Sequence, residues 1–409
     1  MPKSLRRRLL LALAASAAGQ PAGIPWARAD DARRQAEAEA GPTGSAGRMN
    51  PGASATAAPG ATHAPVEPDY APVRQGHRLG FPRDHGMHPG FRIEWWYITG
   101  WLEAMDAGSA KQGSSADPGP FGYQITFFRV RTRHAADNPS RFAPRQLLLG
   151  HAAVADPALG RLRHGQEAWR IGELASIAAD DTRISLPGWR LVRQPDDSYH
   201  AEVDADGFGY SLHLANDGPP VLQGDDGYSR KGPRPEQASY YYSRPGMRAS
   251  GRLRIGRREY DVRGSGWLDH EWSSELMPEE AVGWDWAGIG LDDGGSLLVF
   301  RLRDADGVAV YSHGRLRDAN GRQFDARPEF EALRFWESPR TGIRYPVQWR
   351  IRLGDKSFLL TPLFDDQELD ARRTSGAIYW EGAVRASLDG RIVGRGYVEL
   401  TGYGSRLDV

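Results

Sequence analysis

Residues 94–102 read Glu-Trp-Trp-Tyr-Ile-Thr-Gly-Trp-Leu, and this stretch decides the fold class of the 409-residue chain. Aromatic and β-branched residues favour extended backbone, because they pack well on a pleated surface. Comparable short runs follow at residues 121–129, 240–243, 250–255, 260–269, 296–302, 348–353, 357–362, 377–386 and 391–400. Repeated short runs of this kind predict an all-β protein.

Turn signals separate these runs. Residues 292–295 are Asp-Asp-Gly-Gly, residues 320–321 are Asn-Gly, and Asp-Gly occurs at 306–307 and 389–390. Dipeptides of this type are typical of tight turns between antiparallel strands. The sheets are therefore predicted to be antiparallel.

The arrangement of the runs predicts hairpins and two domains. One hairpin joins residues 249–255 to 260–266, and another joins 383–388 to 391–398. Long amphipathic helices are not evident, and residues 145–154 fit either a strand or a short helix. One closed barrel of this length would be unusually large. We therefore expect two consecutive antiparallel β-barrel domains, at residues 76–277 and 278–409.

Composition excludes several classes of function. Lys+Arg 52 balance Asp+Glu 52, so the chain has no general electrostatic attraction for nucleic acid. The absence of cysteine excludes disulfides, thiolate zinc sites, thiol nucleophiles and a lipid-modified cysteine. Mean hydropathy is -0.56, as expected for a water-soluble body.

The N-terminal residues predict export. Arg6, Arg7 and Arg8 precede an apolar run at residues 9–18, and Ala27-Arg28-Ala29 offers a cleavage site. We expect a signal peptide at residues 1–29, a flexible Ala/Gly/Pro-rich leader at 30–75, and a periplasmic or secreted product. The apolar run is too short to cross a bilayer, so no transmembrane anchor is expected in the mature chain. The paired arginines favour the twin-arginine route, but Leu5 departs from its usual pattern and leaves the route open.

Four motifs carry a resemblance to a known family. They are Phe81-Pro-Arg-Asp-His-Gly-Met-His-Pro-Gly-Phe-Arg-Ile-Glu-Trp-Trp-Tyr-Ile-Thr-Gly100, Ser265-Gly-Trp-Leu-Asp-His-Glu-Trp-Ser273, Gly283-Trp-Asp-Trp-Ala-Gly288 and Ile378-Tyr-Trp-Glu-Gly382. With them the chain resembles the carotenoid 1,2-hydratase, hydroxyneurosporene synthase or AttH-like family of secreted lipocalin-like proteins. The resemblance extends from about residue 77 onward and implies two consecutive lipocalin-like barrels. The family includes polyene hydratases and proteins associated with export systems, so the resemblance leaves the activity open.

Hydration of a carbon–carbon double bond requires a specific kind of site. A protonated carboxyl group must donate a proton to the bond, and an apolar setting raises its pKa so that it stays protonated. Aromatic faces then stabilise the carbocation, and a polar group holds the attacking water. The expected signature is therefore a carboxyl group among tryptophans and tyrosines.

The chain repeats this signature at several places. Asp269 lies between Trp267 and Trp272 and is the first candidate for the proton donor, with His270 as its partner. Asp285 is the second candidate. The other candidates for substrate-binding residues are Glu94, Trp96, Tyr97, Trp272, Trp284, Trp286, Tyr379 and Glu381. If residues 267–272 form a strand, Asp269 and His270 point to opposite faces, so they share a pocket only across a bulge or strand end.

Structural roles compete with these functional ones. A carboxylate beside tryptophan can accept an indole N–H or pair with arginine, and aromatic strands often serve packing alone. For Glu94 and Glu381 such a structural role is favoured. His85 and His88 are placed like metal ligands, but their spacing implies no third ligand, so a loop-fixing role is favoured. We expect no metal and no cofactor.

Two functions remain. One is a cofactor-free hydro-lyase that acts on an apolar, polyene-like or isoprenoid-like molecule. The other is a non-catalytic periplasmic carrier, or an accessory protein of an ABC-type export system. Export favours the second, because polyene synthesis takes place at or inside the inner membrane.

Overall fold

The computed structural model describes residues 70–105, 119–134, 138–140 and 142–407. The predicted signal peptide and the predicted leader as far as residue 69 lie outside this range. Regular structure in the described residues is almost entirely β, with two 3₁₀ turns, η1 (Arg83–His85) and η3 (Pro157–Leu159). The all-β prediction is confirmed. No helix in these residues is long and apolar enough to cross a membrane.

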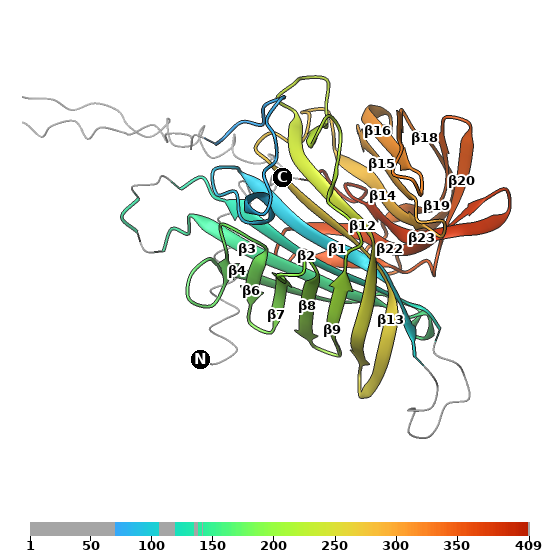
Figure 1. The fold of residues 1–409 in the computed structure, drawn as a ribbon, viewed down its shortest axis with the longest axis horizontal. Helices are drawn as coiled ribbons and strands as arrows, with labels where there is room; N and C mark the ends of the chain where they lie inside the picture. Colours follow the sequence, from blue (N-terminus) through green and yellow to red (C-terminus); the bar gives the residue numbers. More distant parts are fainter. Residues whose placement is uncertain (1–69, 106–118, 135–137, 141, 408–409) are drawn as a thin grey trace, which may run out of the picture.

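The first sheet contains thirteen strands. They are β1 (Ile93–Ala104), β2 (Phe121–Arg131), β3 (Gln146–Ala155), β4 (Arg163–Arg170), β5 (Ser176–Ile177), β6 (Arg183–Leu186), β7 (Trp189–Arg193), β8 (Tyr199–Ala205), β9 (Phe208–Ala215), β10 (Val221–Leu222), β11 (Tyr228–Arg230), β12 (Ala238–Ile255) and β13 (Arg258–Ser273). The main strand order is β4-β3-β2-β1-β13-β12-β9-β8-β7-β6-β5, and β10 and β11 add to β12. The sheet curves into a half-barrel (Figure 1).

The second sheet contains ten strands. They are β14 (Gly283–Leu291), β15 (Ser296–Arg303), β16 (Ala309–Arg317), β17 (Gln323–Ala326), β18 (Glu329–Glu337), β19 (Arg344–Leu353), β20 (Lys356–Pro362), β21 (Glu368–Ala371), β22 (Ala377–Leu388) and β23 (Arg391–Leu400). Their order is β17-β16-β15-β14-β23-β22-β20-β19-β18, with β21 on β22. Two antiparallel sheets in this arrangement are consistent with two lipocalin-like domains.

Each sheet places its first strand beside its last. In the first sheet β1 pairs with β13, and in the second β14 pairs with β23. The sheets are connected by residues 274–282, and the predicted domain boundary after residue 277 lies in this connection. The boundary stays a prediction, because strand pairing alone does not define an independent folding unit.

Most predicted strands are observed, with two refinements. Residues 145–154, which fitted either a strand or a helix, lie almost wholly in β3. The prediction of separate strands at 240–243 and 250–255 is wrong, because both belong to the continuous strand β12. A register shift between Arg244 and Met247 absorbs the Pro-Gly pair that separates them in the sequence. Bulges allow a strand to pass such residues without ending.

Burial on both faces explains the aromatic content of β1. Trp96 and Ile98 belong to the core inside the first sheet. Tyr97 and Trp101 belong to a different cluster, in which residues of the first sheet pack against Trp286 and its neighbours from the second. In Figure 1 the second sheet lies against the neighbouring strands β1, β13 and β12 of the first sheet. The central strands therefore have a buried layer on each side, which favours large apolar side chains in a continuous run.

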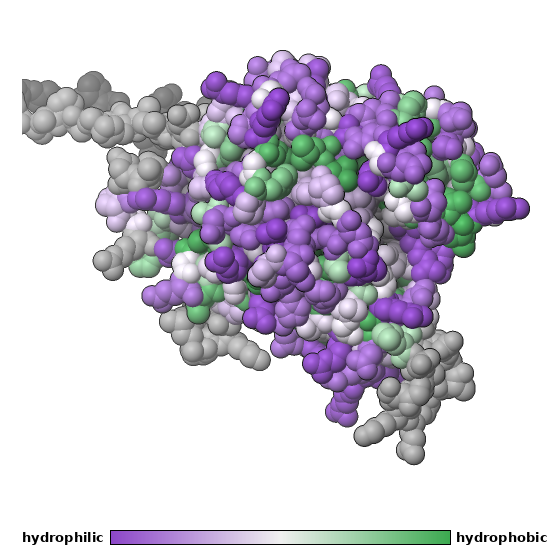
Figure 2. Space-filling view, viewed as in Figure 1, coloured by the Kyte–Doolittle hydropathy of each residue, from purple (hydrophilic) through white to green (hydrophobic). Residues whose placement is uncertain are grey.

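Most of the surface visible in Figure 2 is hydrophilic, with apolar residues in scattered strips. The largest apolar clusters of the described residues are buried within or between the two sheets. The apolar chemistry of the described residues therefore lies inside the sheets and in the layer between them.

Candidate functional site

The strand β13 sends its chemical groups to two different places. Asp269 faces the layer between the sheets, where the Trp267 indole donates to it, whereas His270 faces the interior of the first sheet. The expectation of opposite faces is therefore confirmed. No bulge interrupts the pairing of β13 with β1 here, so the two candidates do not share one pocket.

Asp269 accepts three hydrogen bonds. Ser243 Oγ and Trp267 Nε1 donate to its Oδ1 at 2.5 and 2.7 Å, and the Tyr241 hydroxyl donates to its Oδ2 at 2.8 Å. Burial raises the pKa of Asp269 to about 7, although these three donors act in the opposite direction. The group is thus a carboxyl poised to exchange a proton near neutral pH.

Glu381 also lies in the layer between the sheets. The Tyr97 hydroxyl donates to Glu381 Oε1 at 2.5 Å, and Glu381 Oε2 is buried without a hydrogen-bond partner in the described part of the chain. Burial, and then the nearby charge of Glu399, raise the pKa of Glu381 well above its ordinary value. The hydrogen bond from Tyr97 lowers the pKa of Glu381, but burial and Glu399 raise it by more, so Glu381 is held as a neutral acid.

Glu399 is a third carboxyl group in this layer, half-buried, and was not among the predicted site residues. It accepts a hydrogen bond of 3.0 Å from Trp284 Nε1. Burial raises the pKa of Glu399 to about 7, and the charge of Glu271 acts in the same direction. Glu399 lies directly opposite Glu381 in the pairing of β22 with β23. Like charges on opposed residues repel, which favours at least one shared proton.

The three carboxyl groups share a feature that distinguishes them from ordinary buried acids. Within the described ranges, no lysine or arginine forms an ion pair with Asp269, Glu381 or Glu399. Aromatic rings surround them instead: the Trp286 ring lies edge-on to Tyr97 at 5.3 Å and to Trp267 at 6.1 Å. We call Asp269, Glu381 and Glu399 the acid layer. Carboxyl groups without basic partners among aromatic faces are the arrangement that alkene protonation requires.

Asp285 has a different environment. Arg301 Nε lies 2.7 Å from its Oδ2, Arg303 Nε lies 3.3 Å from its Oδ1, and the Tyr403 hydroxyl donates to it. Two guanidinium groups stabilise the ionised carboxylate. This geometry suits a structural ion pair and not a proton donor.

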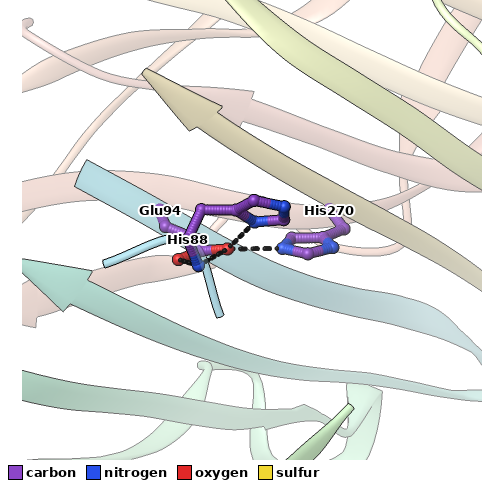
Figure 3. A group of neighbouring side chains, drawn as sticks. All are labelled: His88, Glu94 and His270. Atoms are coloured by element: carbon purple, nitrogen blue, oxygen red, sulfur yellow. Dashed lines mark hydrogen bonds and ion pairs between the residues drawn. The ribbon is translucent and has the colours of Figure 1, made fainter. Parts of the chain in front are cut away.

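Glu94 and His270 lie on the opposite face of the β1–β13 pair, inside the first sheet. His88 Nδ1 and His270 Nε2 lie 2.7 and 2.9 Å from Glu94 Oε1 (Figure 3). Arg129 Nε lies 2.8 Å from Glu94 Oε2. Trp96 stacks on His270 at 4.4 Å. Burial opposes the charge on Glu94, but bonds from the two histidines outweigh it and lower the pKa.

Trp272 lies on this same inner face. Its ring stacks on His88 at a centroid distance of 3.8 Å. We call His88, Glu94, His270, Arg129 and the two stacked tryptophans the inner cluster. It is a packed network of charges and rings, and the first sheet itself separates it from the acid layer. The loop-fixing role of His88 stays a prediction, and the fold also brings to it Glu94 and Trp272, which its spacing in the sequence did not imply.

Tyr379 lies at a third place. Its hydroxyl forms a hydrogen bond of 2.8 Å with His151 Nδ1 from β3, and His151 Nε2 bonds to Thr374 Oγ1. Burial lowers the pKa of His151 to about 3, so the ring is neutral. Tyr379 therefore joins the two sheets beside the acid layer.

A cavity of about 340 Å³ opens between the sheets. Its lining includes Tyr228 and Arg230 from the first sheet and Tyr311 and His313 from the second, and none of the three acid-layer carboxyl groups lines it. Its walls mix polar and apolar surface, which suits the entrance of a binding site better than the apolar seat of a ligand.

A chain of packed side chains lies between this cavity and Asp269. The Phe300 ring packs on Tyr311 and His313, with centroid distances of 6.2 and 5.9 Å. Lys231 Nζ lies 4.1 Å from the Phe300 ring centre and 4.7 Å from that of Tyr241, which bonds to Asp269. Lys231 also pairs with Glu271 at 2.8 Å. We call Phe300, Lys231 and Tyr241 the barrier.

Comparisons with known proteins agree with the fold. The sequence model of the AttH-like family matches residues 72–403. A crystal structure of a protein assigned as AttH from Nitrosomonas europaea is 43% identical, covers 81% of this chain and 99% of its own, and has a TM-score of 0.74.

A more distant structure has the same fold. Kievitone hydratase from Nectria haematococca is 15% identical, with a TM-score of 0.59, and the alignment covers 83% of this chain and 98% of that one. At this identity the similarity shows the fold alone. No curated protein is detectably similar in sequence.

Proposed function

Because the chain belongs to the AttH-like family, we propose that the acid layer is the active site of a cofactor-free hydro-lyase that adds water to a carbon–carbon double bond of an apolar molecule. The observation that carries this proposal is the buried oxygen Glu381 Oε2, which has no hydrogen-bond partner in the described residues and lies on a carboxyl group kept neutral. An unpaired acid in an aromatic layer has little structural value, because an unsatisfied buried polar atom costs about 1–3 kcal/mol.

The environments of the carboxyl groups divide the chemical roles. Glu381, held neutral, donates its proton to one carbon of the double bond. The faces of Tyr97 and Trp286 stabilise the resulting carbocation. Asp269, with its pKa near 7, accepts a proton from the attacking water as the new carbon–oxygen bond forms. Transfer of that proton from Asp269 to Glu381 restores the starting state, and the net reaction converts an alkene and water to an alcohol.

This division differs from the assignment that the sequence favoured. Asp269 was the expected proton donor, but its oxygens accept from Ser243, Tyr241 and Trp267. Three donors stabilise the ionised carboxylate of Asp269, and an ionised carboxylate suits a base better than a proton donor. The acid role therefore passes to Glu381, and Asp269 becomes the base.

A carotenoid-like polyene is the substrate class that the resemblance suggests. The substrate would approach from the cavity lined by Tyr311 and His313 and would displace the barrier to reach Asp269. Export of the mature protein remains part of the proposal and rests on residues 1–29 of the sequence. An exported enzyme must receive its substrate outside the cytoplasm, and this requirement keeps a carrier or an accessory protein of an ABC-type export system as the alternative.

Incubation with lycopene in detergent micelles and heavy-oxygen water tests the reaction. The expected result is a labelled alcohol with the wild-type protein and a loss of at least tenfold in rate with Glu381→Gln and with Asp269→Asn. Asp365→Asn, at a half-exposed carboxylate paired with Arg334, is the matched control and should retain the rate. Retained lycopene without any labelled product would favour the carrier, and unchanged rates in both site variants would overturn the assignment.

A further inference from the structure

The inner cluster contains a second candidate site, which the proposed reaction does not use. We propose that His88 Nδ1, His270 Nε2 and Glu94 Oε1 bind a structural divalent transition-metal ion of the zinc type. The three atoms lie within 4.8 Å of one another. They come from three separate segments, namely the loop before β1, β1 itself and β13, as Figure 3 shows for their side chains.

The geometry of the donor atoms fits a metal ion. Both ring nitrogens lie 2.7–2.9 Å from the same carboxylate oxygen. Tetrahedral ligands that hold a zinc-type ion at about 2.0–2.2 Å are separated from one another by about 3.4 Å, so both nitrogen–oxygen distances would lengthen slightly on binding. The two ring nitrogens, which lie within 4.8 Å of each other, would adjust to the same separation. Two imidazoles and one carboxylate form a common donor set for zinc and its neighbours.

A second layer of contacts supports each proposed ligand. His88 Nε2 lies 3.2 Å from Asp84 Oδ1, and His270 Nδ1 lies 3.1 Å from the Tyr242 hydroxyl. Arg129 Nε lies 2.8 Å from the other oxygen of Glu94. Metal-binding histidines typically use the second ring nitrogen for such a bond, because it fixes the ring and its tautomer. Each of the three ligands has this support.

Burial indicates that the ion would be structural. Glu94 and His270 are fully buried, and His88 is 7% exposed. Tryptophan rings cover the histidines, Trp96 on His270 and Trp272 on His88. An enclosed site of this kind leaves little room for a substrate. A bound ion would fasten the loop that carries Asp84 and His88 to the central strands, and Asp84 at the edge would be the point of entry.

Metal analysis of a tag-free preparation tests the proposal. After treatment with a chelator, addition of zinc should give about one ion per chain by elemental analysis and raise Tm by roughly 5 °C. Addition of cobalt instead should produce visible absorption bands that report nitrogen and oxygen ligands. His88→Gln should abolish the zinc uptake, the rise in Tm and the cobalt bands. His151→Gln, at a buried histidine without a carboxylate partner in the described residues, should keep all of them.

The opposite results are equally clear. A wild-type protein that takes up no zinc, with Tm unchanged and no cobalt bands, would overturn the proposal. A protonated His88, bonded to both Asp84 and Glu94, would then hold these carboxylates together. Retention of the ion in His88→Gln would assign it to another site. If His88→Gln does not fold, the wild-type measurements still decide. None of these results depends on turnover, so the proposal can fail independently of the hydratase.

Discussion

Glu381 on β22 and Glu399 on β23 are directly opposed in an antiparallel hairpin, and Glu381 is buried whereas Glu399 is half-buried. Opposed residues on adjacent strands have Cβ atoms about 5 Å apart, a distance at which two buried negative charges repel strongly. The hairpin is therefore most stable when at least one of the two carboxyl groups is protonated. This relationship makes the protein sensitive to pH in an unusual direction.

Stability should fall as pH rises. The pKa of Glu399 is about 7 in the folded protein and 4.5 ordinarily, so its unfolded form loses the proton first. The contribution of protonated Glu399 to the free energy of unfolding is complete below pH 4.5 and declines between pH 4.5 and 7. Above pH 7 it stays lost, and the total change is about 3 kcal/mol. Glu399→Gln should reduce the decline by about this amount in denaturant unfolding measured across that window, and the raised pKa values of Asp269 and Glu381 should leave the remainder. Exposed Glu337→Gln serves as the control, and an identical slope in wild type and Glu399→Gln would contradict the shifted pKa.

Removal of Asp285 should destabilise the second sheet. Asp285→Asn leaves Arg301 and Arg303 largely buried without their shared counter-charge, and we expect a loss of about 3–5 kcal/mol in the free energy of unfolding. Asp365→Asn breaks a half-exposed pair and should cost less than about 1 kcal/mol. Equal losses in the two variants would show that Asp285 is not the structural anion described above.

Lys231 of the barrier and its buried partner Glu271 should contribute to stability as a coupled pair. Lys231→Met leaves Glu271 buried with Ser239 as its remaining bonded partner, and Glu271→Gln leaves Lys231 without a counter-charge. Each variant should lose about 3 kcal/mol, but the double variant should lose much less than the sum. Chemical denaturation of the four proteins measures the coupling, and simple additivity would argue against a direct interaction.

Close strand packing predicts a strong effect at one glycine. A Cβ at Gly264 would lie 1.8 Å from the Trp101 carbonyl oxygen, so Gly264→Ala must separate β1 from β13. We expect a loss of about 3 kcal/mol or more. Gly290→Ala is the matched strand control, since its nearest neighbour would lie 3.8 Å away, and Tm should barely change. Similar Tm values for the two variants would contradict the packing.

Much of the fold was predictable from local patterns. Alternation along residues 267–272 correctly separated Asp269 from His270, because side chains on a strand point to opposite faces. The predicted hairpin at 383–398 forms, with Leu388 opposite Arg391 beside the turn, and extending that register would have placed Val398 opposite Glu381. A register shift between Ala386 and Ser387 brings Glu399 opposite Glu381 instead, and the sequence pattern did not signal this shift.

The ion pair at Asp285 had a signal. The Asp-Asp-Gly-Gly turn at residues 292–295 predicts a hairpin, and its register places Arg301 directly opposite Asp285. That pairing would have argued against Asp285 as the proton donor, because an arginine beside it favours an ion pair. An acid flanked by tryptophans in the sequence can still have arginines beside it on the next strand.

Other features had no local signal. The contact of Tyr97 with Glu381 joins two sheets, and the approach of His88 and His270 to Glu94 depends on a loop folding onto paired strands distant in sequence. Neither follows from composition or periodicity, because each depends on how the sheets curve and pack. The same is true of Tyr241 and Ser243, whose hydroxyl groups reach Asp269 from β12.

The pairing of first with last strands has a consequence for synthesis. During translation β1 must wait for β13, and β14 must wait for β23, before either sheet gains its central hydrogen bonds. The aromatic edges of β1 and β14 stay exposed meanwhile, when a nascent chain is most prone to aggregate. Glu399 lies on the final strand, so the acid layer is completed last. A holding chaperone, or transport of the chain before it folds, would relieve this delay.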